Sequence, residues 1–119
     1  MPATAKYDLE ERTLAFAKNV NAFIKDLRKT AGNTEYIRQL IRSSGSVGAN
    51  YIEANESLGK KDFLFHIKIC RKEAKETQYW LQLLDCEREE CGRRNDLKGE
   101  AQQLMKIFGA ILEKCKSKQ

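Results

Sequence analysis

The feature that most constrains this chain is a repeat of core-type residues, spaced alternately four and three apart, along almost its whole length. Such spacing averages about 3.5 residues, which is typical of helices that pack along nearly parallel axes. The four runs are Leu9, Thr13, Phe16, Val20, Phe23 and Leu27; Ile37, Ile41, Ser44, Gly48, Tyr51, Asn55 and Leu58; Phe63, Ile67, Cys70, Ala74, Thr77, Leu81 and Leu84; and Leu97, Ala101, Leu104, Phe108, Ile111 and Cys115. The repeat therefore predicts four helices.

Turn and capping residues divide the repeat into helices near residues 8–30, 34–57, 61–90 and 96–116. The residues that mark helix ends are Gly32, Gly59 and Gly92, and those that mark helix starts are Asp8 with Glu11, Asn33 or Thr34, and Asn95. The short connections favour antiparallel neighbours. We therefore predict an all-α fold, an antiparallel up-down-up-down four-helix bundle that forms one domain over residues 1–119.

The histidine and cysteine content argues against a metal site. His66 is the single histidine, and the four cysteines are Cys70, Cys86, Cys91 and Cys115. On a bundle turning near residue 93, Cys70 and Cys115 are expected to share a core layer, far from Cys86 and Cys91, so four thiolates cannot bind one zinc ion. A set of His66, Cys70 and Cys115 remains as an alternative with only three members. We expect no metal and no cofactor.

We expect no membrane span and no signal peptide in this sequence. The longest uncharged run, Ser43 to Ile52, is half polar, and charged sequence follows the first four residues. The cysteines are then expected to be free thiols, as is usual in the cytosol. We therefore expect a cytoplasmic protein.

The second and third predicted helices carry a second face that a simple bundle would leave uncovered. On the third helix this face is an apolar stripe opposite the core stripe, and on the second it is formed by small and polar side chains. Arg42 and Glu76 lie at the same level and are expected to pair. We expect this face to be a homo-oligomer interface; the alternative is a monomer with a few exposed aromatic side chains. The predicted interface residues are Gln39, Arg42, Ser46, Asn50, Glu53, Phe65, Ile69, Glu76, Tyr79, Trp80 and Leu83.

The remaining strip of the third helix is basic. Its residues, here called the basic strip, are Lys61, Lys68, Arg71, Lys72 and Lys75, whereas Glu73 and Glu76 point to other sides. The net charge of +5 arises mainly from the second half of the chain and favours anionic partners. Repeated in each copy of an oligomer, the basic strip is expected to bind nucleic acid. The alternative is an ordinary solvated face.

Three segments of the sequence resemble one known family. They are Gln39-Leu-Ile-Arg-Ser-Ser-Gly-Ser-Val-Gly-Ala-Asn-Tyr-Ile-Glu53, Lys61-Asp-Phe63 and Lys72-Glu-Ala-Lys-Glu-Thr-Gln-Tyr-Trp-Leu-Gln-Leu-Leu84. Together they resemble the four-helix-bundle family encoded by intervening sequences in bacterial 23S ribosomal RNA genes, to which accessory proteins of diversity-generating retroelements are related. The resemblance covers nearly the whole chain. It implies a homo-oligomer, pentameric in known relatives, with a basic surface suited to nucleic acid and no established catalytic activity.

These observations lead to two functions of different classes. The first is a non-enzymatic homo-oligomeric scaffold that binds structured RNA, or an RNA–protein complex, through phosphate contacts, because the chain has no motif that reads base edges. The second is a protein–protein interaction module that serves a partner such as a reverse transcriptase or another nucleic-acid enzyme, without binding RNA itself. We expect no catalytic residues, because the sequence contains no nucleophile–base pair and no phosphate-binding loop.

Overall fold

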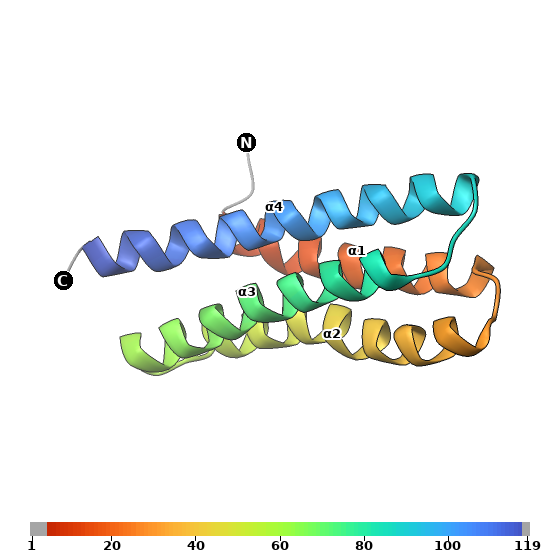
Figure 1. Cartoon of the computed structure of the whole chain (residues 1–119). Helices are drawn as coiled ribbons and strands as arrows, with labels where there is room; N and C mark the ends of the chain where they lie inside the picture. The colour runs from red at the N-terminus through yellow and green to blue at the C-terminus, as the bar shows by residue number, and fades with distance from the viewer. Residues whose placement is uncertain (1–4, 118–119) are drawn as a thin grey trace.

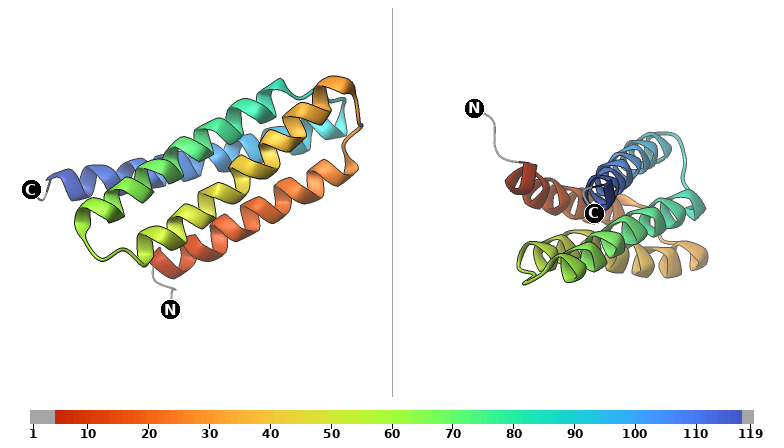
Figure 2. Two further views of the ribbon diagram at one scale, coloured as in Figure 1. Left: turned by 90° about the horizontal axis from the view of Figure 1, so that it is seen from below. Right: turned by 90° about the vertical axis from the view of Figure 1, so that its left-hand side faces the viewer.

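The computed structural model describes the backbone of residues 5–117 and the side chains of residues 9–116. Its helices are α1 (Ala5–Asp26), α2 (Ala31–Asn55), α3 (Lys60–Leu83) and α4 (Glu89–Ser117). They run alternately up and down, and each packs against the next (Figure 1, Figure 2). α4 also packs against α1, which closes the bundle. The predicted all-α up-down-up-down four-helix bundle is confirmed. No helix within residues 5–117 has a stretch long and apolar enough to cross a membrane.

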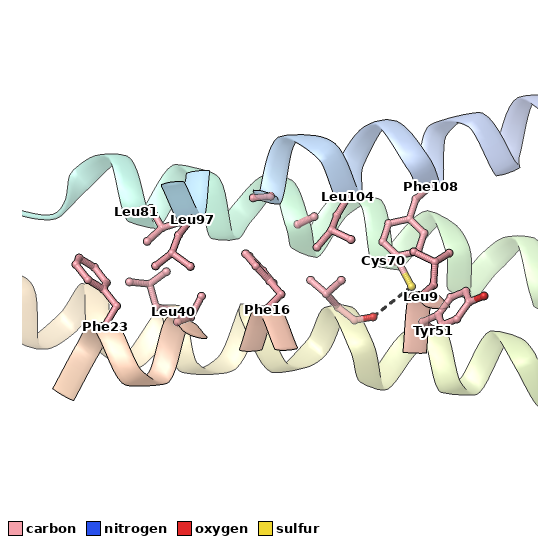
Figure 3. Close-up of a cluster of buried hydrophobic side chains, with 14 of the residues drawn as sticks. Leu9, Phe16, Phe23, Leu40, Tyr51, Cys70, Leu81, Leu97, Leu104 and Phe108 are labelled. Atoms are coloured by element: carbon pink, nitrogen blue, oxygen red, sulfur yellow. Dashed lines mark hydrogen bonds between the residues drawn. The ribbon is translucent and has the colours of Figure 1, made fainter. Parts of the chain in front are cut away.

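Apolar side chains from all four helices meet along the bundle axis (Figure 3). Phe16 and Phe23 of α1, Leu40 of α2, Leu81 of α3 and Phe108 of α4 are all at most 1% exposed. Full burial of each such side chain stabilises a fold by about 1.5–3 kcal/mol. The predicted core runs of α1, α3 and α4 lie on this axis, and only Phe63, Ile111 and Cys115, near one end of it, are partly exposed.

The core face of α2 is rotated from the predicted run. Leu40 and Val47 are fully buried, whereas Ile41, one residue along from Leu40, is 52% exposed. Leu58 lies beyond the end of α2 and is fully exposed. The four-and-three spacing is compatible with a core face that contains either Leu40 or Ile41. Small residues occupy the middle of this helix, so the sequence there shows little contrast between apolar and polar faces. Including Ile41 and Leu58 in the core was therefore wrong.

Small residues on α2 let its neighbours approach closely. A methyl group at Gly48 would lie 3.0 Å from Thr13 Oγ1 and 3.3 Å from Thr13 Cβ, so α1 lies directly against this part of α2. On the other side, Ser43 Oγ lies 2.8 Å from Thr77 Oγ1 of α3, and both residues are buried. Ser43 and Gly48 therefore serve close packing within the chain.

Two of the predicted helix boundaries fail at the junction of α1 and α2. α1 begins at Ala5 and ends at Asp26, and α2 begins at Ala31. The N-cap of α2 is Thr30, whose side chain accepts a hydrogen bond from the Asn33 backbone N–H at 3.1 Å. Gly32 therefore lies in the first turn of α2 and does not end α1. No glycine in the described part of the chain has a positive φ, so none forms the predicted left-handed cap.

The Asn33 side chain explains why α3 ends earlier than residue 90. Asn33 is fully buried, and its Oδ1 accepts from the Asp85 backbone N–H at 2.9 Å. Its Nδ2 donates to the carbonyl oxygens of Asp85 at 3.0 Å and of Arg28 at 3.2 Å. The Asp85 backbone groups thus bond to α2 instead of continuing a helix. α4 begins at Glu89, so Gly92 and Asn95 lie inside it and not at its boundary.

Gly45 and Gly48 provide a matched test of the α1–α2 contact. No atom lies within 4 Å of a methyl group placed at Gly45, so Gly45→Ala should raise the free energy of unfolding by about 0.5–1 kcal/mol through helix propensity. The free energy of unfolding of Gly48→Ala should be at least about 1 kcal/mol lower than that of Gly45→Ala, because the methyl group at residue 48 crowds the buried Thr13. Urea denaturation of both variants at one protein concentration measures the difference. Equal stabilisation by the two substitutions would contradict the close approach of α1 and α2.

Candidate nucleic-acid interface

The acidic flank of α3 faces α2, where its two glutamates pair with one arginine. Arg42 Nη1 donates to Glu73 Oε1 at 3.1 Å, and Arg42 Nη2 donates to Glu76 Oε1 at 2.6 Å. The predicted Arg42–Glu76 pair is therefore confirmed. Glu73 is buried and is a second partner that the sequence did not indicate. Both carboxylates point away from the basic strip, as expected from helix geometry.

The basic strip lies on the exposed part of α3, and four of its five residues line a groove beside α4. All five side chains are exposed. The groove, here called the α3–α4 groove, has a volume of about 610 Å³. Its lining residues are Phe65, Lys68, Ile69, Arg71, Lys72, Lys75 and Met105. Lys61 lies in the first turn of α3 and is not part of the groove lining.

The cations of the groove are unpaired among the described side chains. No carboxylate in residues 9–116 lies within salt-bridge distance of Lys68, Arg71, Lys72 or Lys75. No acidic residue lines the groove. Four positive charges on one helix surface repel one another and create a positive potential that attracts anions. The groove can therefore bind a polyanion without first breaking an ion pair.

α4 completes the groove with residues that the sequence analysis did not single out. Met105 contributes to the lining, and Gly109 lies beside the Arg71 side chain. A methyl group at Gly109 would lie 3.9 Å from both Cδ and Nη1 of Arg71, so the Arg71 side chain extends along α4 at this point. No local pattern singles out Met105, because its place in the groove depends on which face of α4 meets α3.

The polar members of the predicted interface make contacts inside the chain. Asn50 Nδ2 donates to Ser46 O and Ser46 Oγ, each at 3.0 Å, and Asn50 Oδ1 lies 3.2 Å from His66 Nδ1 of α3. Gln39 Oε1 accepts from Arg42 Nε at 3.3 Å. Arg42 and Asn50 of this polar stripe therefore join α2 to α3, whereas the contacts of Gln39 and Ser46 lie within α2. Glu53 is exposed.

The apolar members of the predicted interface lie in three different surroundings. Phe65 and Ile69 line the α3–α4 groove. Trp80 stacks on Tyr36 of α2, with ring centroids 6.3 Å apart, and its Nε1 has no hydrogen-bond partner among the described residues. Tyr79 is 58% exposed and Leu83 is 38% exposed. The surface formed by Tyr79 and Leu83 is here called the α3 apolar patch, and its role in an oligomer stays a prediction.

The cysteines do not have the arrangement expected from the sequence. Cys70 is buried and donates from Sγ to Val47 O at 3.4 Å, and burial raises the pKa of its thiol to about 12. Arg71 lies beside Gly109, so Cys115 lies further along α4 than the level of Cys70. The predicted shared layer is wrong because α3 ends at Leu83, well before the turn assumed near residue 93.

The described residues contain no group of three or more histidine, cysteine or acidic side chains that could hold a metal ion. His66 and Cys70 therefore belong to no three-member set in this part of the chain. His66 instead lies between Asn50 of α2, as described above, and Asp62, whose Oδ1 is 3.6 Å from His66 Nε2.

Comparison with known proteins gives a family and solved structures of similar fold. A family model described as 23S rRNA-intervening sequence protein matches residues 5–110. The crystal structure of a protein of unknown function from the S23 ribosomal protein family of Bacteroides thetaiotaomicron is 27% identical, with a TM-score of 0.78. The similarity covers 91% of this chain and 97% of that one. No match was found among curated proteins.

Arg42 offers a test of the charge arrangement on α3. Arg42→Gln leaves Glu73 buried without its cation and should lower the free energy of unfolding by about 1–3 kcal/mol. Arg38→Gln is the matched control, because Arg38 forms an exposed pair with Glu35 on the same helix at 2.7 Å and should contribute at most about 0.5 kcal/mol. Denaturant unfolding measures the free energy of unfolding of both variants. The double variant Arg42→Gln with Glu73→Gln should recover part of the loss, and equal losses in the two single variants would contradict the assignment.

Proposed function

The chain belongs to the 23S rRNA-intervening sequence protein family, and from this premise we propose that it is a cytoplasmic, non-enzymatic, homo-oligomeric scaffold that binds RNA through the α3–α4 groove. One observation carries the proposal. Lys68, Arg71, Lys72 and Lys75 line one groove, and none of them pairs with a described carboxylate. The name of the family links its genes to ribosomal RNA, which makes RNA the polyanion to test first.

Phosphate binding is the chemistry that this groove supports. A lysine or arginine that neutralises a phosphate releases condensed counterions, so affinity falls steeply as salt rises. Four cations on one copy provide few phosphate contacts. Several copies held together would bind one RNA at high effective concentration, which raises the overall affinity without any new contact. An oligomer is therefore part of the proposal, and a pentamer is the number that the family resemblance implies.

The α3 apolar patch is the surface that we propose for contact between copies. Tyr79 and Leu83 expose apolar area on the outward side of α3, next to the half-buried Trp80. The same patch would also serve a protein partner such as a nucleic-acid enzyme, which is the alternative function. The two functions differ in whether the purified chain binds RNA and in whether the patch is covered by a second copy.

Neutralising the groove should abolish most RNA binding. Replacement of Lys68, Arg71 and Lys75 by Gln should weaken binding about 10-fold or more at low salt and flatten the salt dependence, because each lost phosphate contact removes about 0.7–0.9 from the logarithmic slope. Fluorescence anisotropy with a labelled RNA at several salt concentrations measures both effects. The matched control replaces Lys18, Lys25 and Lys29, three exposed cations outside the groove, and should retain the wild-type slope.

Two results would overturn this assignment. Unchanged binding by the groove variant would mean that the basic strip is only a solvated face. If the wild-type chain binds no RNA even at low salt, the scaffold proposal fails and the protein-interaction function replaces it.

The oligomer can be tested separately with the α3 apolar patch. Tyr79→Glu should reduce the mass from several chains to one, because a charge would be buried unpaired between copies, while a single chain can expose it to solvent. Light scattering after size exclusion measures the mass, and circular dichroism shows that the helices persist. Leu14→Glu is the matched control, because Leu14 is 55% exposed on α1 and lies outside the predicted interface. A wild-type monomer, or dissociation by the control alone, would contradict the proposed interface.

A further inference from the structure

We infer that the α3–α4 groove takes an unpaired segment of RNA, with one base against Phe65, Ile69 and Met105 and the flanking phosphates on Lys68, Arg71, Lys72 and Lys75. This inference rests on the proposed function and makes it more specific. It adds a base contact to a surface for which the sequence indicates phosphate contacts alone.

The apolar half of the groove lining requires an apolar group on the ligand. Phe65 is 59% exposed, and Ile69 and Met105 are partly exposed beside it. A surface that binds only phosphates needs cations, and an exposed phenylalanine adds nothing to it. A nucleobase has an apolar π-face that stacks on an aromatic ring whatever its sequence. The volume of about 610 Å³ lies within the range of pockets that bury small organic ligands.

The charged half of the lining matches the backbone on either side of such a base. Lys68, Arg71, Lys72 and Lys75 follow one another along α3, and the groove contains no acidic side chain. A cationic groove combined with an aromatic stacking surface is the common arrangement in proteins that bind single strands. The mixture of one aromatic, two aliphatic and four cationic side chains therefore fits a nucleotide better than it fits either a bare phosphate or an uncharged ligand.

A paired RNA helix would satisfy only half of this groove. In an A-form duplex the base faces are stacked inside the helix, and mainly phosphates and 2′-hydroxyl groups meet the protein. Phe65 would then stay uncovered by the ligand. An unpaired base in a loop, bulge or end can leave its stack and cover the ring. The RNA partner is therefore expected to carry single-stranded nucleotides where it meets the groove.

The two lining residues Phe65 and Ile69 also belong to the predicted oligomer interface. In the structure they lie with the cations of α3 and with Met105, whereas Tyr79 and Leu83 lie outside the groove. A second copy seated on Phe65 would place its own surface against four unpaired cations. We therefore assign Phe65 and Ile69 to RNA and leave the α3 apolar patch to contact between copies.

The test compares a labelled 12-nucleotide oligoadenylate with an RNA duplex of the same length, using the full chain. Phe65→Ala should weaken binding of the single strand by roughly 5- to 150-fold, the range measured when one base–aromatic stack is lost. It should leave duplex affinity and the salt slope unchanged, since no charge is removed. Phe65→Trp should restore single-strand binding. Leu14→Ala, which removes a similarly exposed apolar side chain outside both the groove and the α3 apolar patch, should leave single-strand affinity unchanged.

The possible failures are distinguishable from failure of the proposed function. If the triple glutamine variant loses RNA binding but Phe65→Ala retains it for both probes, the RNA-binding function stands and the stacked base is wrong. The inference is also overturned if Phe65→Ala loses affinity equally for the single strand and the duplex. Tighter binding of the duplex than of the single strand by the wild type overturns it as well. A fall in oligomer mass for Phe65→Ala would assign Phe65 to a second copy and would overturn it as well.

Discussion

The Arg42 guanidinium bonds to Glu73 and Glu76 and thereby determines which side of α3 carries free charge. Helix geometry turns these two carboxylates away from the basic strip, and the contact with Arg42 holds them against α2. With it, both carboxylates on the flank toward α2 are paired, and the flank toward α4 carries Lys68, Arg71, Lys72 and Lys75 without partners among the described side chains. The proposed RNA site is thus a consequence of how α2 packs on α3.

The number, order and direction of the helices could be predicted from the sequence because the core repeat is strong in three of the four helices. α2 was harder: with Ser44 and Gly48 in the predicted run, Leu40 and Ile41 fit the spacing equally well, and only packing against α1 and α3 separates them. The helix ends depend on tertiary contacts. The side chain of Asn33 bonds to the backbone of Asp85, more than 50 residues away, and no local pattern indicates that.

The sequence predicts which face of α3 carries the candidate site, but it does not predict the groove that this face forms with α4. Helix geometry alone groups the basic strip and separates it from Glu73 and Glu76. The groove also needs Met105, whose place in the lining depends on the rotation of α4 about its axis. The burial of Glu73 under Arg42 was missed because it depends on how α2 packs against α3, and a charged residue on a basic helix is usually solvated. Sequence patterns place charges on one face of a helix, but the packing of the neighbouring helices determines whether that face lines a groove.

The most direct test of this account is to locate bound RNA on the chain by photocrosslinking. A single-stranded RNA that carries a photoreactive base, irradiated with the wild-type protein and mapped by mass spectrometry, should attach to peptides that contain Phe65 or Met105 of the groove. The yield should fall as salt rises, because phosphate contacts hold the base in place. Crosslinks confined to α1, to α2 or to the end of α4 beyond Gly109 would contradict the account.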